Sequence, residues 1–109
     1  MKPKLRVWLV FLDQVKVGAG RAELMESIDT TGSIKAAAEQ FGMSYRHVWG
    51  YLRELEKAAG FQFFERQRGG GKTGGAHLTP RGKAFLTQYR QFQHRLETTA
   101  DREFRRIFR

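Results

Sequence analysis

The chain has 109 residues, which is enough for a single small domain with a modest hydrophobic core. Its 20 lysines and arginines outnumber its 11 aspartates and glutamates, and the net charge of +9 favours a polyanionic partner: DNA, RNA or an anionic membrane surface. The absence of cysteine excludes disulfides and thiolate metal sites, and the three histidines lack the spacing of metal ligands. No apolar stretch approaches the roughly 20 residues of a transmembrane helix, so we expect a cytoplasmic protein with no membrane association, no metal and no cofactor.

The first element is predicted to be a strand over Leu5 to Val17, which is rich in valine, leucine, tryptophan and phenylalanine. Gly18 and Gly20 end it. Both faces of the run from Val7 to Leu12 are apolar, so neither face should be fully exposed to water. We therefore expect this strand to pack on the core, on a partner chain, or on both.

Two short helices are predicted next. Arg21 to Asp29 has the spacing of a helix with one face in the core, and a second helix begins after Ser33, which is its N-cap. The apolar positions of the second helix recur at i, i+3, i+4 and i+7: Ile34, Ala37, Ala38 and Phe41. Its alanines allow another helix to approach closely.

A third helix follows after a short turn. Gly42 is predicted to end the second helix in the left-handed conformation, and Ser44 to cap a helix from about Tyr45 to Ala59 that Gly60 ends. Two short helices joined by so tight a glycine-containing turn cross steeply, as in a helix-turn-helix. The helical repeat separates a buried stripe from an exposed face: Val48, Leu52, Leu55 and Ala59 against Arg46, Gly50, Arg53 and Lys57.

The rest of the chain predicts a hairpin and a long helix. Phe61 to Arg66 is strand-like, Arg68 to Gly75 has the composition of a flexible loop, and His77-Leu78 is the returning strand. Thr79-Pro80 then opens a helix that continues to near Phe108. Its apolar residues alternate four and three apart, which is a coiled-coil spacing. The candidate dimerisation residues are Phe85, Tyr89, Phe92 and Leu96.

Together these elements predict a mainly α protein with a small β-hairpin wing. The expected architecture is a winged helix-turn-helix with an N-terminal strand and a long C-terminal dimerisation helix. We expect a single domain over 1–109, in which 18–60 form a three-helix core, 61–79 form the wing and 80–108 form the dimerisation helix.

Basic and hydroxyl side chains gather at the start of the second and third helices and in the wing loop. The N-terminal half of a recognition helix meets base edges in the major groove, whereas helix N-termini and basic loops suit phosphates. Arg46 can pair with guanine through two hydrogen bonds, and Gly50 lets DNA approach the helix backbone; Tyr45 can instead pack at the edge of the core. The predicted DNA-binding residues are Ser33, Lys35, Ser44, Tyr45, Arg46, His47, Gly50, Arg53, Arg68, Lys72 and Thr73. No catalytic grouping stands out, so we do not expect an enzyme.

With these residues in place, the chain resembles the N-terminal DNA-binding domain of the molybdate-responsive ModE-type regulators and, more distantly, the LysR-type DNA-binding domain. The ModE-like stretches are Gly32-Ser33-Ile34, Gly42-Met43-Ser44-Tyr45-Arg46 followed by Trp49, Glu65-Arg66 before the glycine-rich loop, and Leu78-Thr79-Pro80-Arg81-Gly82. The LysR-like stretch runs from Leu55-Glu56-Lys57 through Gly60 to Phe64-Glu65-Arg66. The resemblance covers roughly Leu5 to Phe92.

The resemblance implies a winged-helix fold, a homodimer held by the long last helix, and repression or activation at a palindromic operator in double-stranded DNA. Full-length ModE-type proteins bind molybdate through C-terminal domains without a counterpart here, so we expect a regulator without a fused effector domain. The alternative is a domain of a longer protein, although Met1 and the well-formed last helix favour a stand-alone regulator. Two other interpretations stay open: an architectural DNA-binding protein with little sequence preference, and a protein-interaction adaptor.

Overall fold

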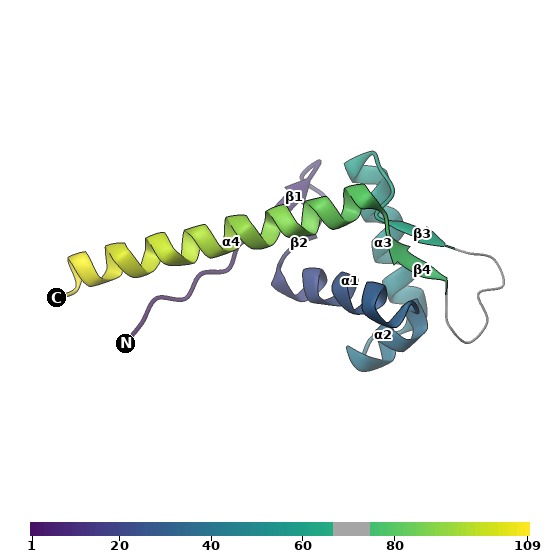
Figure 1. Ribbon diagram of the computed structural model, residues 1–109, viewed down its shortest axis with the longest axis horizontal. Coiled ribbons are helices and arrows are strands. Elements are labelled where there is room, and N and C mark those ends of the chain that lie inside the picture. The colour runs from purple at the N-terminus through teal and green to yellow at the C-terminus, as the bar shows by residue number, and fades with distance from the viewer. Residues whose placement is uncertain (67–74) are drawn as a thin grey trace.

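The fold was determined as a computed structural model, which describes residues 1–66 and 75–109. Within those ranges the elements follow in the order β1 (Leu9–Phe11), β2 (Val15–Val17), α1 (Ala19–Thr31), α2 (Ile34–Gln40), α3 (Tyr45–Ala59), β3 (Phe64–Arg66), β4 (Ala76–Leu78) and α4 (Pro80–Ile107). The predicted class, mainly α with a small β-hairpin, is confirmed. Figure 1 shows the compact three-helix part at one end and α4 extending away from it.

The predicted N-terminal strand is instead a hairpin. β1 pairs with β2 in antiparallel register, with Val10 opposite Lys16, and each strand is only three residues long. The chain reverses at Leu12 and Asp13, which both adopt positive φ angles of 52° and 54°. A single strand over Leu5–Val17 was the wrong prediction because residues other than glycine make this left-handed turn, against their usual preference.

α2 and α3 begin where their capping residues predict, and α3 ends at Gly60 as predicted. The Ser33 Oγ accepts a hydrogen bond from the Ala36 backbone N–H, and the Ser44 Oγ accepts one from that of His47, each at 3.0 Å. Gly42 has a φ of +65° in the turn between α2 and α3, which a side chain would disfavour. α1 is two residues longer at each end than predicted, and Gly32 ends it in the left-handed conformation.

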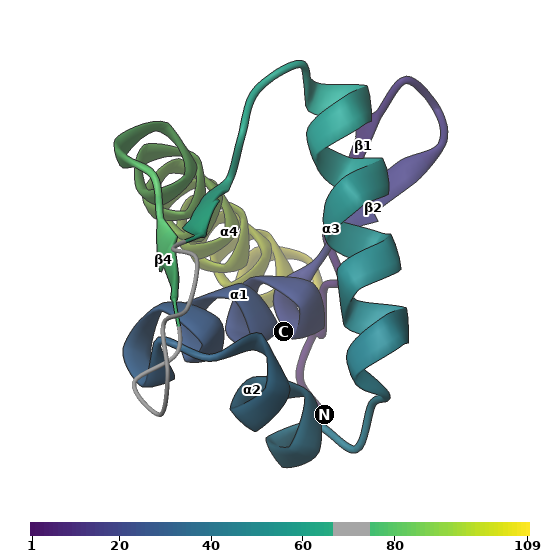
Figure 2. The same cartoon turned by 90° about the vertical axis from the view of Figure 1, so that its right-hand side faces the viewer.

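The core lies where α1, α2 and α3 meet. Most residues of their predicted inward faces are buried, and Phe41 and Ala59 are partly buried. The buried ones are Leu24, Met25, Ile28, Ile34, Ala37, Ala38, Val48, Leu52 and Leu55. Val17 of β2 and the aromatic pair Phe63 and Phe64 complete this cluster. Figure 2 shows α1 and α2 crossing beside α3, so that one face of α3 is covered and the other is left to solvent.

The second hairpin is fastened to both α1 and α4. In its register Phe64 lies opposite Leu78, and the Leu78 N–H donates to the Asp29 carboxylate of α1 at 2.9 Å. The Thr79 side chain caps α4 by accepting from the Gly82 N–H at 2.9 Å. At Gly82, α4 approaches the hairpin so closely that an added Cβ would lie 2.6 Å from the Phe63 carbonyl oxygen.

α4 packs on the core over its first half only. Its buried residues are Gly82, Leu86 and Tyr89, and the helix then runs on beside the N-terminal segment (Figure 1). The Tyr89 hydroxyl donates to the Val7 carbonyl at 2.8 Å, and Arg90 forms an ion pair with Glu26 of α1 at 2.7 Å. The described helices include none that combines the length and the apolar character required to cross a membrane.

Candidate nucleic-acid interface

The outward face of α3 carries the basic residues that the helical repeat places there. Arg46, Gly50, Arg53 and Lys57 are all exposed, on the side opposite the buried Val48, Leu52 and Leu55. A Cβ added at Gly50 would meet nothing within 4 Å, so the helix surface is open at this point. The face therefore offers cationic and hydrogen-bonding groups around a position where another molecule can approach the backbone.

The start of α2 lies against the wing side of α3. Ser33, Lys35, Tyr45 and Trp49 line an open hollow of about 280 Å³, together with Arg66 at the base of the second hairpin. Three of the predicted DNA-binding residues, Ser33, Lys35 and Tyr45, are thus brought together. Tyr45 is half exposed, and its hydroxyl accepts a hydrogen bond from the Trp49 indole N–H.

Glu56 and Arg66 hold the base of the second hairpin on α3, a role that the sequence pattern did not reveal. One oxygen of the Glu56 carboxylate accepts from the backbone N–H groups of Phe63 and Phe64, at 2.8 and 3.1 Å. The other lies 3.4 Å from the Arg66 guanidinium, which stacks on the Trp49 ring at 4.3 Å. A partly buried carboxylate that pairs with a cation and with backbone donors fixes where the hairpin leaves α3.

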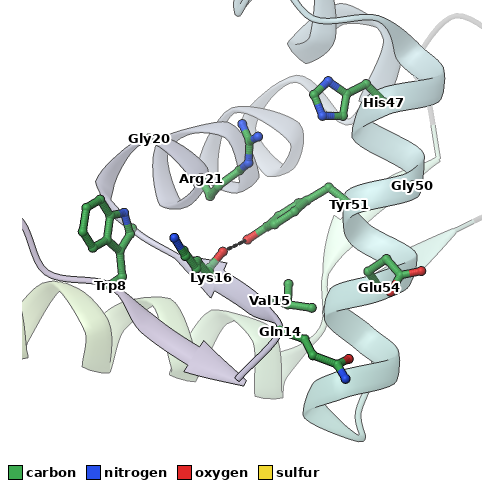
Figure 3. A pocket seen from close by; sticks show the side chains of 11 residues that line it. Trp8, Gln14, Val15, Lys16, Gly20, Arg21, His47, Gly50, Tyr51 and Glu54 are labelled. Carbon is green, nitrogen blue, oxygen red and sulfur yellow. Dashed lines mark hydrogen bonds between the residues drawn. The ribbon is translucent and has the colours of Figure 1, made fainter. Parts of the chain in front are cut away.

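The opposite side of α3 borders an open pocket of about 650 Å³, here called the hairpin pocket. It is enclosed by the first hairpin, the start of α1 and one stripe of α3 (Figure 3). Its lining includes Trp8, Lys16, Arg21, His47, Gly50 and Tyr51. His47 and Gly50 were predicted DNA-binding residues, whereas Lys16 and Arg21 were not found, because their proximity depends on the unpredicted first hairpin.

Tyr51 ties the first hairpin to α3. Its hydroxyl donates a hydrogen bond of 2.7 Å to the Lys16 backbone carbonyl (Figure 3). Burial raises the pKa of Tyr51 well above that of an ordinary tyrosine, so the phenol keeps the proton that it donates. The Arg21 guanidinium lies over the Tyr51 ring, 4.9 Å from its centre, which joins the start of α1 to the same contact.

The four candidate dimerisation residues divide into two pairs. Tyr89 is 1% exposed, and the Phe85 ring packs on those of Phe11 and Phe63, with ring centres 5.4 Å apart in both contacts. Phe92 is 45% exposed and Leu96 is partly exposed, beyond the point where α4 leaves the core. The prediction that all four face a partner is therefore corrected for Phe85 and Tyr89, because four-three spacing does not distinguish a contact within the chain from one between chains.

Three predicted DNA-binding residues, Arg68, Lys72 and Thr73, lie outside the described residues. Of the others, Ser44 caps α3, and Arg46 and Arg53 lie on its outward face. The described part of the proposed interface thus combines the starts of α2 and α3, the outward face of α3 and the base of the wing.

Residues 21–83 match the family described as "Bacterial regulatory helix-turn-helix protein, lysR family". The chain belongs to the LysR family. The matched range contains α1 from Arg21 onward, α2, α3 and the second hairpin, which are the elements that build the interface described above. This LysR-family chain is therefore a regulatory helix-turn-helix protein, and its helix-turn-helix is of the DNA-binding kind.

Curated relatives confirm the resemblance to ModE-type proteins. The molybdenum-pterin-binding protein MopB of Rhodobacter capsulatus is 35% identical over 74 residues, which are 68% of this chain and 27% of MopB. The molybdenum transport protein ModE of Azotobacter vinelandii is 30% identical over 87 residues, which are 80% of this chain and 32% of that protein. This LysR-family chain thus spans roughly a quarter to a third of the length of the curated relatives that it matches.

Solved structures confirm the winged helix-turn-helix fold. The crystal structure of the CbnR_DBD–DNA complex superposes on this LysR-family chain with a TM-score of 0.59 and 25% sequence identity. The match covers 81% of this chain and 94% of the CbnR chain. The crystal structure of CbnR, a LysR family transcriptional regulator, has a TM-score of 0.55 and covers 75% of this chain and 27% of CbnR.

Proposed function

We propose that this protein is a sequence-specific DNA-binding transcriptional regulator that acts as a dimer on a palindromic operator. The observation that carries the proposal is the outward face of α3, where Arg46, Gly50 and Arg53 are exposed between the wing base and the hairpin pocket. A helix with one buried and one basic, open face fits the major groove of B-DNA. The CbnR_DBD chain, which has a similar fold, was crystallised in a complex with DNA, and this supports a DNA-binding function.

In this proposal the residues divide between base contacts and phosphate contacts. Arg46 lies in the first turn of α3, where a recognition helix contacts base edges, and its guanidinium suits the O6 and N7 atoms of guanine. Arg53 lies two turns further along the same face and suits a phosphate. Lys35 and the Ser33 cap suit a second phosphate near the start of α2, and the wing residues Arg68, Lys72 and Thr73 are proposed to reach the neighbouring groove.

Binding selection on a random duplex library, repeated at two salt concentrations, tests this function. We expect an enriched inverted repeat whose half-sites lie about one DNA turn, roughly 34 Å, apart. Binding without enrichment, falling steeply with salt, would instead establish an architectural DNA-binding protein. An affinity for the duplexes that does not change with salt would show that the protein makes no phosphate contacts. That result would favour a protein-interaction adaptor.

Arg46→Ala should relax the base preference of the protein. On the selected operator we expect a loss of about 1–3 kcal/mol, because a bidentate contact to one base pair is removed, with reduced discrimination at that position alone. Arg53→Ala is the matched control, since loss of a phosphate contact weakens binding to all duplexes about equally. The measurement is a titration of each variant with the operator and with operators changed at single positions. A uniform loss for Arg46→Ala would argue against its role in base recognition.

The second half of α4 is proposed to form the dimer interface. Phe92, which is exposed, and Leu96, which is partly exposed, lie one turn apart beyond the part of α4 that packs on the core. Ile107 and Phe108 are also exposed, 69% and 61%, at its end. A second copy that packs on this stretch would remove these apolar side chains from water, which stabilises association by about 25 cal/mol per Å².

Leu96→Glu should convert the dimer to a monomer. A carboxylate at the centre of an apolar helix interface must be desolvated without a partner, and this opposes association. Sedimentation or light scattering over a range of concentrations measures the mass, and Gln91→Glu is the control because Gln91 is an exposed residue on the same helix. If Leu96→Glu keeps a dimer of parental stability, the interface lies elsewhere on the chain.

A further inference from the structure

We propose that the hairpin pocket is a second phosphate-binding site, which holds the DNA backbone on the side of α3 opposite the wing. The inference rests on the proposed DNA-binding function and adds residues that neither the sequence pattern nor the family match assigns to it: Lys16 and Arg21. Lys16 lies outside the matched range, which begins at Arg21.

The pocket borders the outward face of α3 on one flank. His47, Gly50, Tyr51 and Glu54 follow one another at i, i+3, i+4 and i+7 and so form one stripe of the helix that faces the pocket. Trp49 lies on the other flank, against Arg66 at the wing base. A helix in the major groove has a phosphate strand on each side, so a protein that contacts only the wing-side strand leaves the second strand unpaired with cations.

Two cations line the pocket, the exposed Lys16 and the partly buried Arg21. The Lys16 Nζ lies 5.3 Å from the centre of the Trp8 ring, and the Arg21 guanidinium lies 4.9 Å from that of Tyr51. Figure 3 shows both side chains between these two rings. Among residues 1–66 and 75–109, neither cation forms an ion pair with a carboxylate. Their charge is therefore available to an incoming anion, and the rings reduce the conformational entropy lost when it binds.

The first hairpin is held so that Lys16 keeps its place. The Trp8 ring lies against Gly18, where an added Cβ would be 2.5 Å from the ring carbon Cδ1. The Tyr51 hydroxyl holds the hairpin as well, since it donates a hydrogen bond of 2.7 Å to the Lys16 carbonyl. These contacts fix the backbone of Lys16 beside α3, which is what a pre-formed phosphate site requires.

The rim of the pocket includes two glycines with open space around them. Added Cβ atoms at Gly20 and Gly50 would meet nothing within 4 Å. Glu54 is the carboxylate among the described lining residues, one turn beyond Gly50, and Figure 3 shows it directed away from Lys16 and Arg21. Because the opening is continuous with Gly50 on the outward face of α3, a backbone phosphate of bound DNA fits it better than a small anion that must be enclosed.

Salt-dependent DNA binding tests the site. We expect Lys16→Gln and Arg21→Gln each to weaken operator binding about tenfold at low salt, through loss of one charge-assisted contact. Each should also reduce the slope of log Kd against log salt by about 0.9, with no change in base preference. Lys2→Gln is the matched control, because Lys2 is exposed near the N-terminus, remote from α3, and its substitution removes the same charge. The slope of this variant should equal that of the parent.

Gly20→Glu guards against a variant that merely misfolds. Its side chain enters open space in the first turn of α1, where a carboxylate does not disturb a helix, so the fold and melting temperature should be retained. A carboxylate there should repel the phosphate and weaken operator binding by tenfold or more. Circular dichroism and thermal melting of all variants confirm that they fold before their affinities are compared.

The site and the proposed function fail in different ways. If Lys16→Gln and Arg21→Gln keep the parental slope while Arg53→Gln lowers it, the protein binds DNA but the hairpin pocket does not. If no variant changes a slope, including Arg53→Gln, the proposed DNA-binding function itself is wrong.

A titration of the free protein with phenyl phosphate tests the other source of phosphate, a small ligand. The Trp8 indole N–H resonance reports binding. A submillimolar Kd would make the pocket a small-ligand site and overturn the assignment to the DNA backbone.

Discussion

Gly50→Leu should abolish high-affinity operator binding while the domain stays folded. The leucine side chain would stand on the outward face of α3 and hold the helix away from the floor of the major groove. Arg46 and Arg53 on the same face would then lose their contacts together. We expect a loss of about 3 kcal/mol or more, which is roughly a 150-fold increase in Kd on the selected operator.

The stability of this variant should change in the opposite direction. A Cβ at Gly50 meets nothing within 4 Å, and glycine inside a helix is less favourable than alanine by roughly 0.5–1 kcal/mol. Gly50→Ala should therefore raise the melting temperature and weaken binding only slightly, and Gly50→Leu should melt no lower than the parent. Thermal melting and operator titration of both variants make the comparison. Parental affinity for Gly50→Leu would show that DNA does not approach this face of α3.

Gly82→Ala should destabilise the domain, although helix propensity alone predicts the reverse. The added Cβ would lie 2.6 Å from the Phe63 carbonyl oxygen and 3.1 Å from its Cα, and these are backbone atoms that cannot rotate away. Either α4 or the second hairpin must shift, which loosens the Thr79 cap and its 2.7 Å hydrogen bond to the Gln62 carbonyl. We expect a loss of about 2–3 kcal/mol in the free energy of unfolding, typical of overpacking at a rigid contact.

Gly20→Ala is the matched control for Gly82→Ala. Both glycines lie near the start of a helix, but a Cβ at Gly20 has open space around it. This control should gain roughly 0.5–1 kcal/mol, so the two variants move in opposite directions in one urea-denaturation experiment at 25 °C. A stabilised Gly82→Ala would mean that α4 does not pack on Phe63 as described.

The sequence predicted the parts of the fold that depend on local chemistry. Ser33, Ser44 and Thr79 cap their helices as expected, because an N-cap is decided by one side chain and a backbone donor two or three residues away. The buried and exposed faces of α3 also follow from the helical repeat alone. The exposure of the candidate residues on the outward face of α3 was therefore predicted correctly from the sequence.

Contacts between distant residues could not be predicted in the same way. The turn at Leu12 and Asp13 has no glycine or proline to mark it, so the first hairpin and the pocket beside it were missed. Phe85 and Tyr89 have the spacing of an intermolecular seam, yet each has a partner within the chain. The Phe85 ring packs on Phe11 and Phe63, and Tyr89 is buried and bonded to the Val7 carbonyl. Both errors involve the N-terminal segment. Its hairpin was not predicted, and its residues Phe11 and Val7 supply the contacts to this face of α4.

The positions of the chain ends have a practical consequence for handling the protein. The N-terminal segment runs back along α4, and the Tyr89 hydrogen bond to Val7 holds it there, so both ends emerge at the side remote from α3 (Figure 1). An affinity tag, a fluorophore or a surface linker joined to either end would leave the α3 face accessible. Immobilising the protein through its N-terminus should therefore present every molecule to duplexes in solution with the recognition helix unobstructed.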